Sequence, residues 1–234
     1  MNILITGASK GIGREVAKKF ASRAGNHVIA LSRNKNLLDQ LVMECKLDNP
    51  RTRITPLVFD LENGDYENDL FNSVKNQCSK LDIIINNAGL LINKPFQDSS
   101  DNDFDRMFNI NVKSVFKLSK VLLPLLVENT HIVNISSMGG FQGSAKFPGL
   151  ALYSASKGAL AVFTEALAEE LKDQKIKVNC LALGAVQTEM LSEAFPGYNA
   201  PVNPKEMARL ITDFALNGST FFNGKILPVS ISTP

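Results

Sequence analysis

The sequence predicts an α/β fold, with a doubly wound parallel sheet of about seven strands and helices on both faces. Three observations support this prediction. Short apolar runs alternate with helical stretches, in the order βαβαβαβ, as far as Asn86. The first apolar run passes through a glycine-rich turn directly into a helical pattern. Small polar residues follow several of the strands, at the sheet edge where open parallel sheets bind ligands.

Length and composition favour one domain over residues 1–234. The chain is 44% hydrophobic, enough for a sizeable core, and it has no low-complexity linker and no repeat. The 25 basic and 23 acidic residues are mixed along the chain, which argues against a dedicated nucleic-acid-binding protein. The N-terminus enters a strand directly and no apolar stretch reaches membrane-spanning length, so we expect a cytoplasmic protein without a membrane segment.

Cysteine and histidine usage predicts neither a disulfide framework nor a metal site. The three cysteines are odd in number and fall within apparent helices or strands. The two histidines each precede an apparent strand, and no residues have the spacing of metal ligands. We therefore expect no metal cofactor.

The segment Ile3–Gly13 predicts a phosphate-binding turn. Its apolar start is typical of a buried parallel strand, and Gly7, Gly11 and Gly13 follow with the spacing G-x-x-x-G-x-G. Glycines allow a tight turn and a close approach of the backbone to a pyrophosphate, while the helix that begins near Ile12 offers free N–H groups. A glycine-rich surface turn is the alternative interpretation of this motif.

The second strand predicts the identity of the nucleotide. A helix over 12–23 leads to a strand over 27–31, and Ser32 and Arg33 then stand where an NAD-binding unit carries an acidic residue. Arg33 can bind a ribose 2′-phosphate, and Lys10 in the glycine turn can add a second cation. Solvated turn charges are the alternative for both. The pattern favours NADP(H) over NAD(H).

The next elements continue the alternation, with a helix, a strand, a helix and a strand over 35–46, 54–59, 65–79 and 82–86. The strand over 54–59 ends at Asp60 and Leu61, so Asp60 is placed to meet an adenine edge, although a lone Asp is also a common turn residue. The strand over 82–86 is followed by Asn87, Ala88 and Gly89, which are again small or polar.

A long apolar helix is expected over 101–129, with Pro124 in its last turns. Its apolar residues cover more than one face, so the pattern indicates burial on two sides. Asn111 interrupts that surface, and a buried amide needs hydrogen-bond partners. A strand over 131–136 and Ser137 come next, followed by a glycine-rich loop over 138–152.

Tyr153 and Lys157 open the following helix, expected over 153–172, and share one face because they are four residues apart. Alone, such a pair is a weak signal. Here it follows a parallel strand that ends in serine, and the chain then resembles the short-chain dehydrogenase/reductase family. The motifs that carry the resemblance occur in family order along nearly the whole chain: Thr6–Gly13, Asn86–Gly89, Asn111, Ser136-Ser137, Tyr153-x-x-x-Lys157, Asn179 and Gly184–Thr188.

The resemblance implies a Rossmann domain and a role for each matching residue. Tyr153 would be the general acid/base, with its pKa lowered by the cation of Lys157, and Lys157 would also bind the nicotinamide ribose. Ser137 would hold the substrate oxygen, and Asn111 would keep open a water path to Lys157. Residue pattern and resemblance together place NADP(H) against Gly7, Ser9, Lys10, Gly11, Ile12, Gly13, Ser32, Arg33, Asp60, Leu61, Asn87, Ala88, Gly89, Tyr153, Lys157, Gly184, Val186 and Thr188.

The chain departs from the family pattern at three places. More residues than usual separate Ser137 from Tyr153, so Ser144 in the extended loop is an alternative substrate contact, with Ser137 preferred because it adjoins the strand. The family's usual Pro-Gly after the sixth strand is Leu183-Gly184 here, which removes a rigid φ. The family's Asp-Gly-Gly ending is absent, and a seventh strand is expected within 223–229.

The resulting prediction is an NADP(H)-dependent oxidoreductase acting on a ketone, an aldehyde or the corresponding alcohol. Its substrate loops are expected over 90–100, 138–152 and 185–203, with a partly apolar pocket lined by Leu91, Phe141, Phe147, Leu150 and Phe195. Two alternatives remain open: a reductase of carrier-linked 3-oxoacyl chains, for which Lys94 and Lys146 are weak docking candidates, and a nucleotide-sensing protein without turnover. Two apolar stripes on the helix over 153–172, together with the resemblance, predict a homodimer or homotetramer.

Overall fold

A computed structural model describes residues 1–231 and contains one sheet of seven parallel strands. The strands are β1 (Asn2–Thr6), β2 (His27–Ser32), β3 (Arg53–Val58), β4 (Leu81–Asn86), β5 (Leu126–Ser137), β6 (Lys177–Leu183) and β7 (Ile226–Val229). They lie in the order β3-β2-β1-β4-β5-β6-β7, and each neighbouring pair is parallel. This is the predicted doubly wound sheet.

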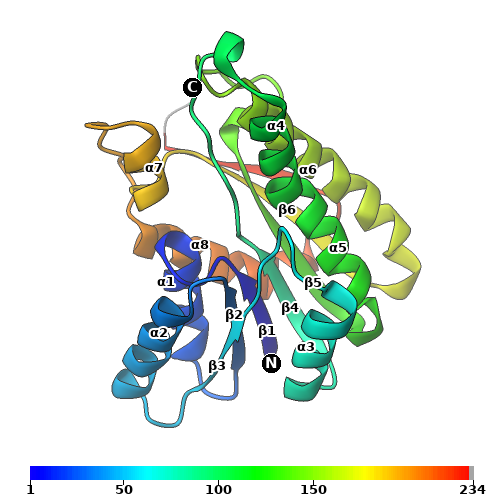
Figure 1. Cartoon of the computed structure of the whole chain (residues 1–234). Coiled ribbons are helices and arrows are strands. Elements are labelled where there is room, and N and C mark those ends of the chain that lie inside the picture. The colour runs from blue at the N-terminus through cyan, green and yellow to red at the C-terminus, as the bar shows by residue number, and fades with distance from the viewer. Residues whose placement is uncertain (232–234) are drawn as a thin grey trace.

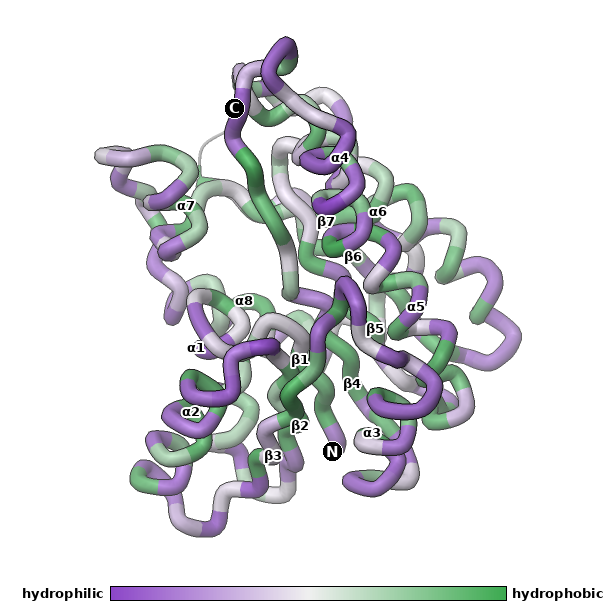
Figure 2. Tube along the Cα trace, in the orientation of Figure 1, coloured by the Kyte–Doolittle hydropathy of each residue, from purple (hydrophilic) through white to green (hydrophobic). Residues whose placement is uncertain are grey.

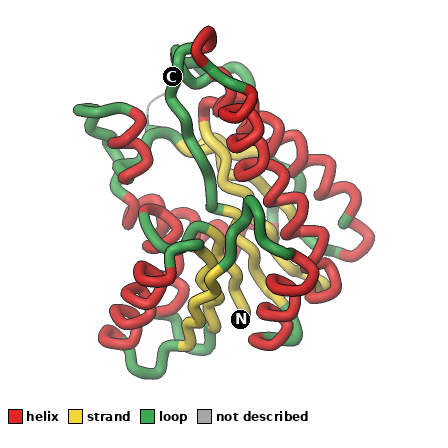
Figure 3. The backbone as a smooth tube through the Cα atoms, viewed as in Figure 1, coloured by secondary structure: helices red, strands yellow, loops and turns green. Residues whose placement is uncertain are grey.

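Helices cover both faces of the sheet (Figure 1). The α-helices are α1 (Gly11–Ala21), α2 (Lys35–Asp48), α3 (Phe71–Gln77), α4 (Asp101–Phe108), α5 (Ser114–Leu122), α6 (Ala151–Glu170), α7 (Glu189–Ala194) and α8 (Pro204–Asn217). Helices α1, α2 and α8 lie on one side, while α3, α4, α5 and α6 lie on the other (Figure 1). Figure 3 shows the strands as the middle layer between these two groups.

The alternation of side chains along each strand builds two separate cores. On β1, Ile3 and Ile5 pack with α1, α2 and α8, whereas Leu4 packs with the helices of the opposite face. Successive side chains of a strand point to opposite faces, so a strand covered on both faces must be apolar throughout. Figure 2 shows this directly, since the central strands are hydrophobic while the outer turns of the helices are hydrophilic.

The long helix expected over 101–129 is wrong in its extent. It consists of α4, one π-helical turn over Asn109–Lys113, α5, and a 3₁₀ turn over Leu123–Leu125, and β5 already begins at Leu126. Pro124 cannot donate the backbone hydrogen bond that would continue the helix. Beyond it, Thr130 holds the chain against the sheet, because its Oγ1 accepts from the Val127 N–H and donates to the Leu81 carbonyl.

Three other segments differ from the sequence prediction. Helix α6 begins at Ala151, so the loop expected over 138–152 is shorter, and the helix expected over 65–79 opens with a π-helical turn at Tyr66–Leu70. Helices α7 and α8 lie where no helix was predicted. The signal for α8 was present, since Asn203 and Glu206 form a capping box around Pro204.

Candidate active site

The candidate site lies where the carboxyl ends of β1, β4, β5 and β6 meet. These strands end at Thr6, Asn86, Ser137 and Leu183. Strand β1 has β2 on one side and β4 on the other, so the direction in which the strands are added reverses between β1 and β4. In an open parallel sheet, the crevice outside the strand ends at such a reversal is the usual ligand site.

The glycine turn requires its glycines. Gly7 and Gly11 have φ angles of +68° and +57°, in the left-handed region that favours glycine. A Cβ on Gly7 would lie 2.9 Å from Ala88 Cα, and one on Gly13 would overlap the Asn87 amide. Lys10 precedes the helix and makes no side-chain cap, so the first N–H groups of α1 face the site as donors for an anion.

Thr6 and Asn87 hold the glycine turn against the end of β4. The Thr6 hydroxyl accepts from the N–H groups of Asn87 and Ala88, at 3.1 and 3.0 Å. The Asn87 amide donates in return to the Thr6 carbonyl at 3.0 Å. Thr6 was not among the predicted site residues, although its place directly before the first glycine was a signal for this role.

The adenosine end of the predicted site gathers Ser9, Ser32 and Arg33. The Ser32 hydroxyl donates to Ser9 Oγ at 2.8 Å and accepts from the Asn34 N–H at 3.3 Å, which ties the glycine turn to the end of β2. Arg33 and Lys10 are both exposed. Two hydroxyls and two free cations at one strand end suit a phosphate monoester.

Asp60 stands at the end of β3, as predicted, next to the buried Leu61. Burial by itself would raise the pKa of Asp60, but hydrogen bonds from the Glu62 N–H and the Asn63 side chain, together with the charge of Arg33, hold it below its ordinary value. Asp60 is therefore ionised, and its carboxylate caps the turn that follows it.

Ser137, Tyr153 and Lys157 meet between the end of β5 and the first turns of α6. Ser137 lies close to Tyr153 and acts as a hydrogen-bond partner that lowers the pKa of its phenol. Lys157 is 4% exposed, donates from Nζ to the Ile135 carbonyl at 2.9 Å, and lies 5.9 Å from the centroid of the Tyr153 ring. The fold therefore brings Ser137, at the end of β5, to the Tyr153 and Lys157 pair on α6.

The pKa values of this group correct one expectation. The sequence predicts that Lys157 lowers the pKa of Tyr153, whereas burial raises it, and only the hydrogen bond from Ser137 acts in the opposite direction. Burial also lowers the pKa of Lys157 to about 8. Burial thus governs both groups, and the ammonium of Lys157 is directed at the Ile135 carbonyl.

Asn111 lies in the π-helical turn between α4 and α5 and is fully buried. Its Oδ1 accepts from the Leu90 N–H at 2.8 Å, and its Nδ2 donates to the Leu90 carbonyl and to Ser156 Oγ, each at 2.9 Å. A Cβ on Gly89 would lie 3.3 Å from Lys157 Nζ and 3.4 Å from Asn111 Oδ1. Asn111 and Lys157 thus both border the space beside Gly89, which a Cβ at that position would narrow. Ser156 was not predicted.

The two candidate serines have different surroundings. Ser144 Oγ donates to the carbonyls of Met138 and Phe141 within its own loop, and Lys146 Nζ lies 2.7 Å from the same hydroxyl. Ser137 is at the strand end, where its Oγ accepts from the Gly139 N–H at 3.1 Å and its side chain lies close to Tyr153. The Ser144 hydroxyl is thus bonded only within its loop, whereas Ser137 both caps the start of the loop and lies beside Tyr153.

Gly184, Val186 and Thr188 follow β6 and reach toward the glycine turn. A Cβ on Gly184 would meet Ser230, and Val186 forms a bridge with Val202. The Thr188 hydroxyl caps α7 by accepting from the Leu191 N–H at 3.3 Å, and its methyl group lies 3.4 Å from a Cβ position on Gly11. Thr188 is an N-cap that stands directly over the glycine turn.

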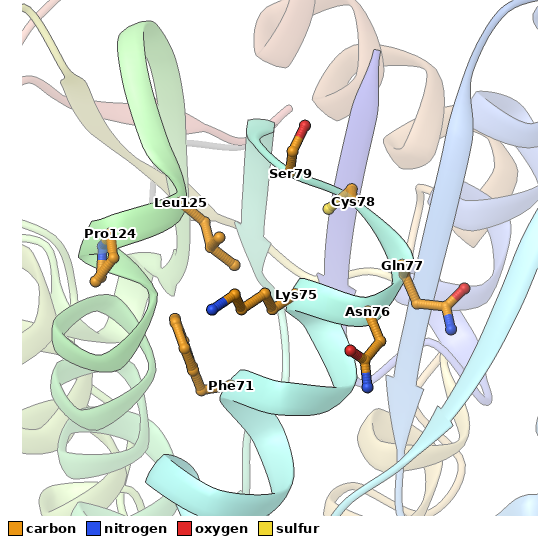
Figure 4. A pocket seen from close by; sticks show the side chains of 8 residues that line it. All are labelled: Phe71, Lys75, Asn76, Gln77, Cys78, Ser79, Pro124 and Leu125. Atoms are coloured by element: carbon orange, nitrogen blue, oxygen red, sulfur yellow. The ribbon is translucent and has the colours of Figure 1, made fainter.

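Two cavities are open to solvent. One of about 710 Å³ lies beside the site, between the start of α6 and the loop after β5. Phe141, Phe147 and Leu150 line it as predicted, whereas Leu91 and Phe195 do not. The other, of about 500 Å³, is shown in Figure 4, where Lys75, Cys78 and Leu125 border it. It lies at the amino ends of β4 and β5, at the opposite edge of the sheet from Ser137.

Neither a metal site nor a membrane-spanning helix is found within residues 1–231. No group of His, Cys, Asp and Glu side chains there could hold a metal ion. Cys45, Cys78 and Cys180 are buried free thiols. In that same part of the chain no helix has the length and apolarity needed to cross a membrane.

Comparison with known proteins gives consistent matches. The model of a family described as short chain dehydrogenase matches residues 1–199. Carbonyl reductase (NADPH) 2 of Sus scrofa is 36% identical, over 81% of this chain and 73% of its own length. A 3-oxoacyl-acyl-carrier-protein reductase of Thermotoga maritima is 30% identical, over 97% and 94%. The crystal structure of a short-chain dehydrogenase from Shigella flexneri, complexed with NADP, superposes with a TM-score of 0.87 at 31% identity, over 97% and 95%.

Proposed function

The chain belongs to the short-chain dehydrogenase/reductase family of oxidoreductases, and on that premise we propose that it transfers a hydride between NADP(H) and a ketone, an aldehyde or the corresponding alcohol. The observation that carries the proposal is the group formed by Ser137, Tyr153 and Lys157 beside the glycine turn. A hydroxyl pair that can share a proton, next to a buried cation, is suited to protonating a carbonyl oxygen.

The residues present fit a dinucleotide phosphate. The left-handed Gly7 and Gly11 and the uncapped start of α1 would form a cradle for the pyrophosphate. A side chain on Gly7 or Gly13 would collide with Asn87, so the turn could not keep this shape. Ser32, Arg33 and Lys10 would hold the 2′-phosphate, and Asp60 with Leu61 would border the adenine. The neighbour from Shigella flexneri, which is complexed with NADP, supports this choice of cofactor.

In the proposed reaction, each side chain has one task. When bound, the nicotinamide ring supplies or accepts the hydride. Tyr153 donates its phenolic proton to the substrate oxygen, and Ser137 hydrogen-bonds the same oxygen. Lys157 restores the proton, since the pKa of its buried ammonium is about 8 and allows exchange near neutral pH. Asn111 keeps the space beside Lys157 in shape through its bonds to Leu90 and Ser156.

A second candidate function is the reduction of carrier-linked 3-oxoacyl chains, which the relative from Thermotoga maritima supports. That reaction needs a basic surface that docks an acidic carrier. Lys94, however, is paired with Asp103 at 2.8 Å, and Lys146 donates to the Phe141 and Ser144 carbonyls. Both cations have partners within the chain, so free carbonyl compounds are the better candidates. A nucleotide sensor without turnover would not need the hydroxyls of Ser137 and Tyr153 beside a buried lysine, because it transfers no proton.

The test is NADPH oxidation by the purified protein with a panel of ketones, aldehydes and carrier-linked or free 3-oxoacyl thioesters, beside a direct measurement of NADPH binding. We expect binding together with turnover of at least one free carbonyl compound. Turnover of carrier-linked thioesters alone would favour the second function. Binding without turnover of any compound in the panel would favour the sensor.

A further inference from the structure

The three predicted substrate loops meet at one residue, Asn93. Its Nδ2 donates to the Ala194 carbonyl at 2.8 Å, which ties the loop after β4 to the last turn of α7. Its Oδ1 lies against Gly149 in the loop after β5, where a Cβ would overlap it. The neighbouring Lys94 N–H donates to the Gly149 carbonyl at 3.0 Å. We call Asn93, Gly149 and Ala194 the Asn93 latch.

Helix α7 depends on contacts at its two ends. None of its six residues, Glu189–Ala194, is buried, so no side chain anchors it in either core. At its start, Thr188 and Glu189 lie over the glycine turn, since Thr188 Cγ2 and Glu189 Oε2 are 3.4 and 3.6 Å from a Cβ position on Gly11. At its end, the latch holds Ala194. Helix α7 therefore spans from the glycine turn to the Asn93 latch.

The loop that carries Gly149 gives the latch a firm support. Gly149 has a φ of +83°, so its position suits glycine both in conformation and in space. Lys146 Nζ donates to the Phe141 and Ser144 carbonyls at 2.7 and 3.1 Å, which braces the same loop from inside. This loop is also the one that is longer than usual for the family. This loop thus supplies the Gly149 contacts with Asn93 and Lys94 at the latch.

We propose that Asn93 is a positioning residue, which keeps α7 over the glycine turn so that Thr188 and Gly11, side by side, both contact NADP(H). The effect on the cofactor rests on the proposed function, whereas the mechanical effect on α7 does not. The hydrogen bond from Asn93 to Ala194 is exposed to solvent. Its loss should therefore raise the rate of amide hydrogen exchange in α7 by a modest factor and leave the two cores unchanged.

The first experiment measures hydrogen exchange of the backbone amides of Ser192 and Phe195, which are bonded within α7 to Thr188 and Leu191. The variants are Asn93→Ala, Gly149→Ala and the double substitution, all without ligand. The control is Asn72→Ala, which removes an exposed bond from the Asn72 amide in α3 to the Asn68 carbonyl in the π-helical turn before it, far from the site. We expect exchange about two- to fivefold faster in each latch variant and unchanged in the control.

The double substitution separates the latch from general damage. Gly149→Ala acts by displacing Asn93, so the two changes should not add if both break the same contact. Additive acceleration, or unchanged exchange at Ser192 and Phe195 in Asn93→Ala, would overturn the latch.

The second experiment measures the NADPH dissociation constant, kcat and KM of the same variants. We expect the Asn93→Ala dissociation constant to rise about two- to fivefold, with KM rising more than kcat falls. Faster exchange in α7 with unchanged NADPH affinity and unchanged KM would overturn the positioning role. A wild-type protein that binds no NADPH would refute the proposed function instead, and the exchange data would still decide whether the latch exists.

Discussion

At the scale of single residues, burial sets the protonation of the catalytic group. Tyr153 and Lys157 are both removed from water, which raises the pKa of the phenol and lowers that of the ammonium to about 8. Near neutral pH the phenol therefore keeps its proton, and the lysine remains mostly charged but is able to exchange. This arrangement suits a phenol that donates its proton to a carbonyl oxygen and then regains a proton from Lys157.

The first prediction concerns Tyr153 and Lys157. Tyr153→Phe removes the hydroxyl and keeps the ring, so NADPH binding should survive while single-turnover NADPH oxidation falls by roughly 10²–10⁴. Lys157→Ala should weaken both turnover and NADPH binding, because it removes the buried cation and a proposed ribose contact. The double variant should lose no more turnover than the worse single one. Wild-type turnover in Tyr153→Phe would disprove its role as the acid.

The second prediction concerns Arg33. We expect NADPH to bind more tightly than NADH, and Arg33→Ala to reduce that preference by about tenfold, the lower part of the range for a charge-assisted bond, because Arg33 is exposed. Arg51→Ala is the control, since Arg51 is also exposed but lies in the turn before β3. Dissociation constants for both cofactors check this prediction. Equal affinities in the wild type would contradict it.

At the scale of elements, β5 joins the catalytic group to the far edge of the sheet. Ser137 ends the strand, and His131, midway along it, is 1% exposed. The His131 ring contacts the Ala215 carbonyl of α8 through Nδ1 at 2.9 Å and the Asn179 amide of β6 through Nε2 at 3.1 Å. The amide donates, so Nε2 accepts and the ring is neutral. If Nε2 carried a proton, its N–H and the Asn179 N–H would both be donors, and no hydrogen bond could form between them.

The third prediction follows from that contact. Burial lowers the pKa of His131 in the folded protein, although the Ala215 carbonyl acts in the opposite direction, while the unfolded chain titrates near 6.5. Between these two values the unfolded state binds more protons, so the free energy of unfolding should fall as the pH drops below about 6.5. His27, whose pKa is also lowered by burial, adds to the same trend.

Denaturant unfolding of the wild type and of His131→Gln between pH 7.5 and pH 5 checks this prediction, because glutamine takes up no proton in this range. We expect a shallower pH dependence in the variant, by up to one proton. Parallel pH profiles for the two proteins would show that His131 does not contribute.

At the scale of the whole molecule, the outer surface formed by α4, α5 and α6 is unusually apolar. Phe104 and Phe116 are 44% and 46% exposed, and Val162 is 64% exposed. Phe104 stacks on Phe108, with ring centroids 4.3 Å apart, and Phe116 meets Phe163 edge-on. The helices α4 and α5 lie beside α6 along one side of the molecule (Figure 1). Adjacent apolar residues on one face mark a surface for association.

The fourth prediction is therefore a homodimer or homotetramer that uses this face. Val162→Glu places a charge at the most exposed of these positions and should lower the mass measured by light scattering at micromolar concentration. Met43→Glu is the control, because Met43 is 58% exposed on α2, on the opposite side. A monomeric wild type, or a Val162→Glu protein of unchanged mass, would contradict the assignment of this face.

The sequence by itself determined the sheet and its layers, and it named the residues of the candidate catalytic group. An apolar run of strand length is a local signal in the sequence. A strand such as β1, which is covered on both faces, is apolar throughout and is therefore easy to recognise. The motifs around Gly7 and Tyr153 were readable because each role requires a particular residue type at a short, fixed spacing. The sequence also carried an overlooked signal for α8 in Asn203, Pro204 and Glu206.

Only the tertiary structure decided which distant residues share a contact. The end of the middle helix depended on Thr130 reaching the Leu81 carbonyl, and only the structure showed that the Ser144 hydroxyl is bonded within its own loop. The pKa of Tyr153 depended on burial, which motif spacing does not encode. The Asn93 latch joins three loops from separate parts of the chain. Each is a balance of desolvation and hydrogen bonding between residues far apart in sequence, so no local pattern could predict it.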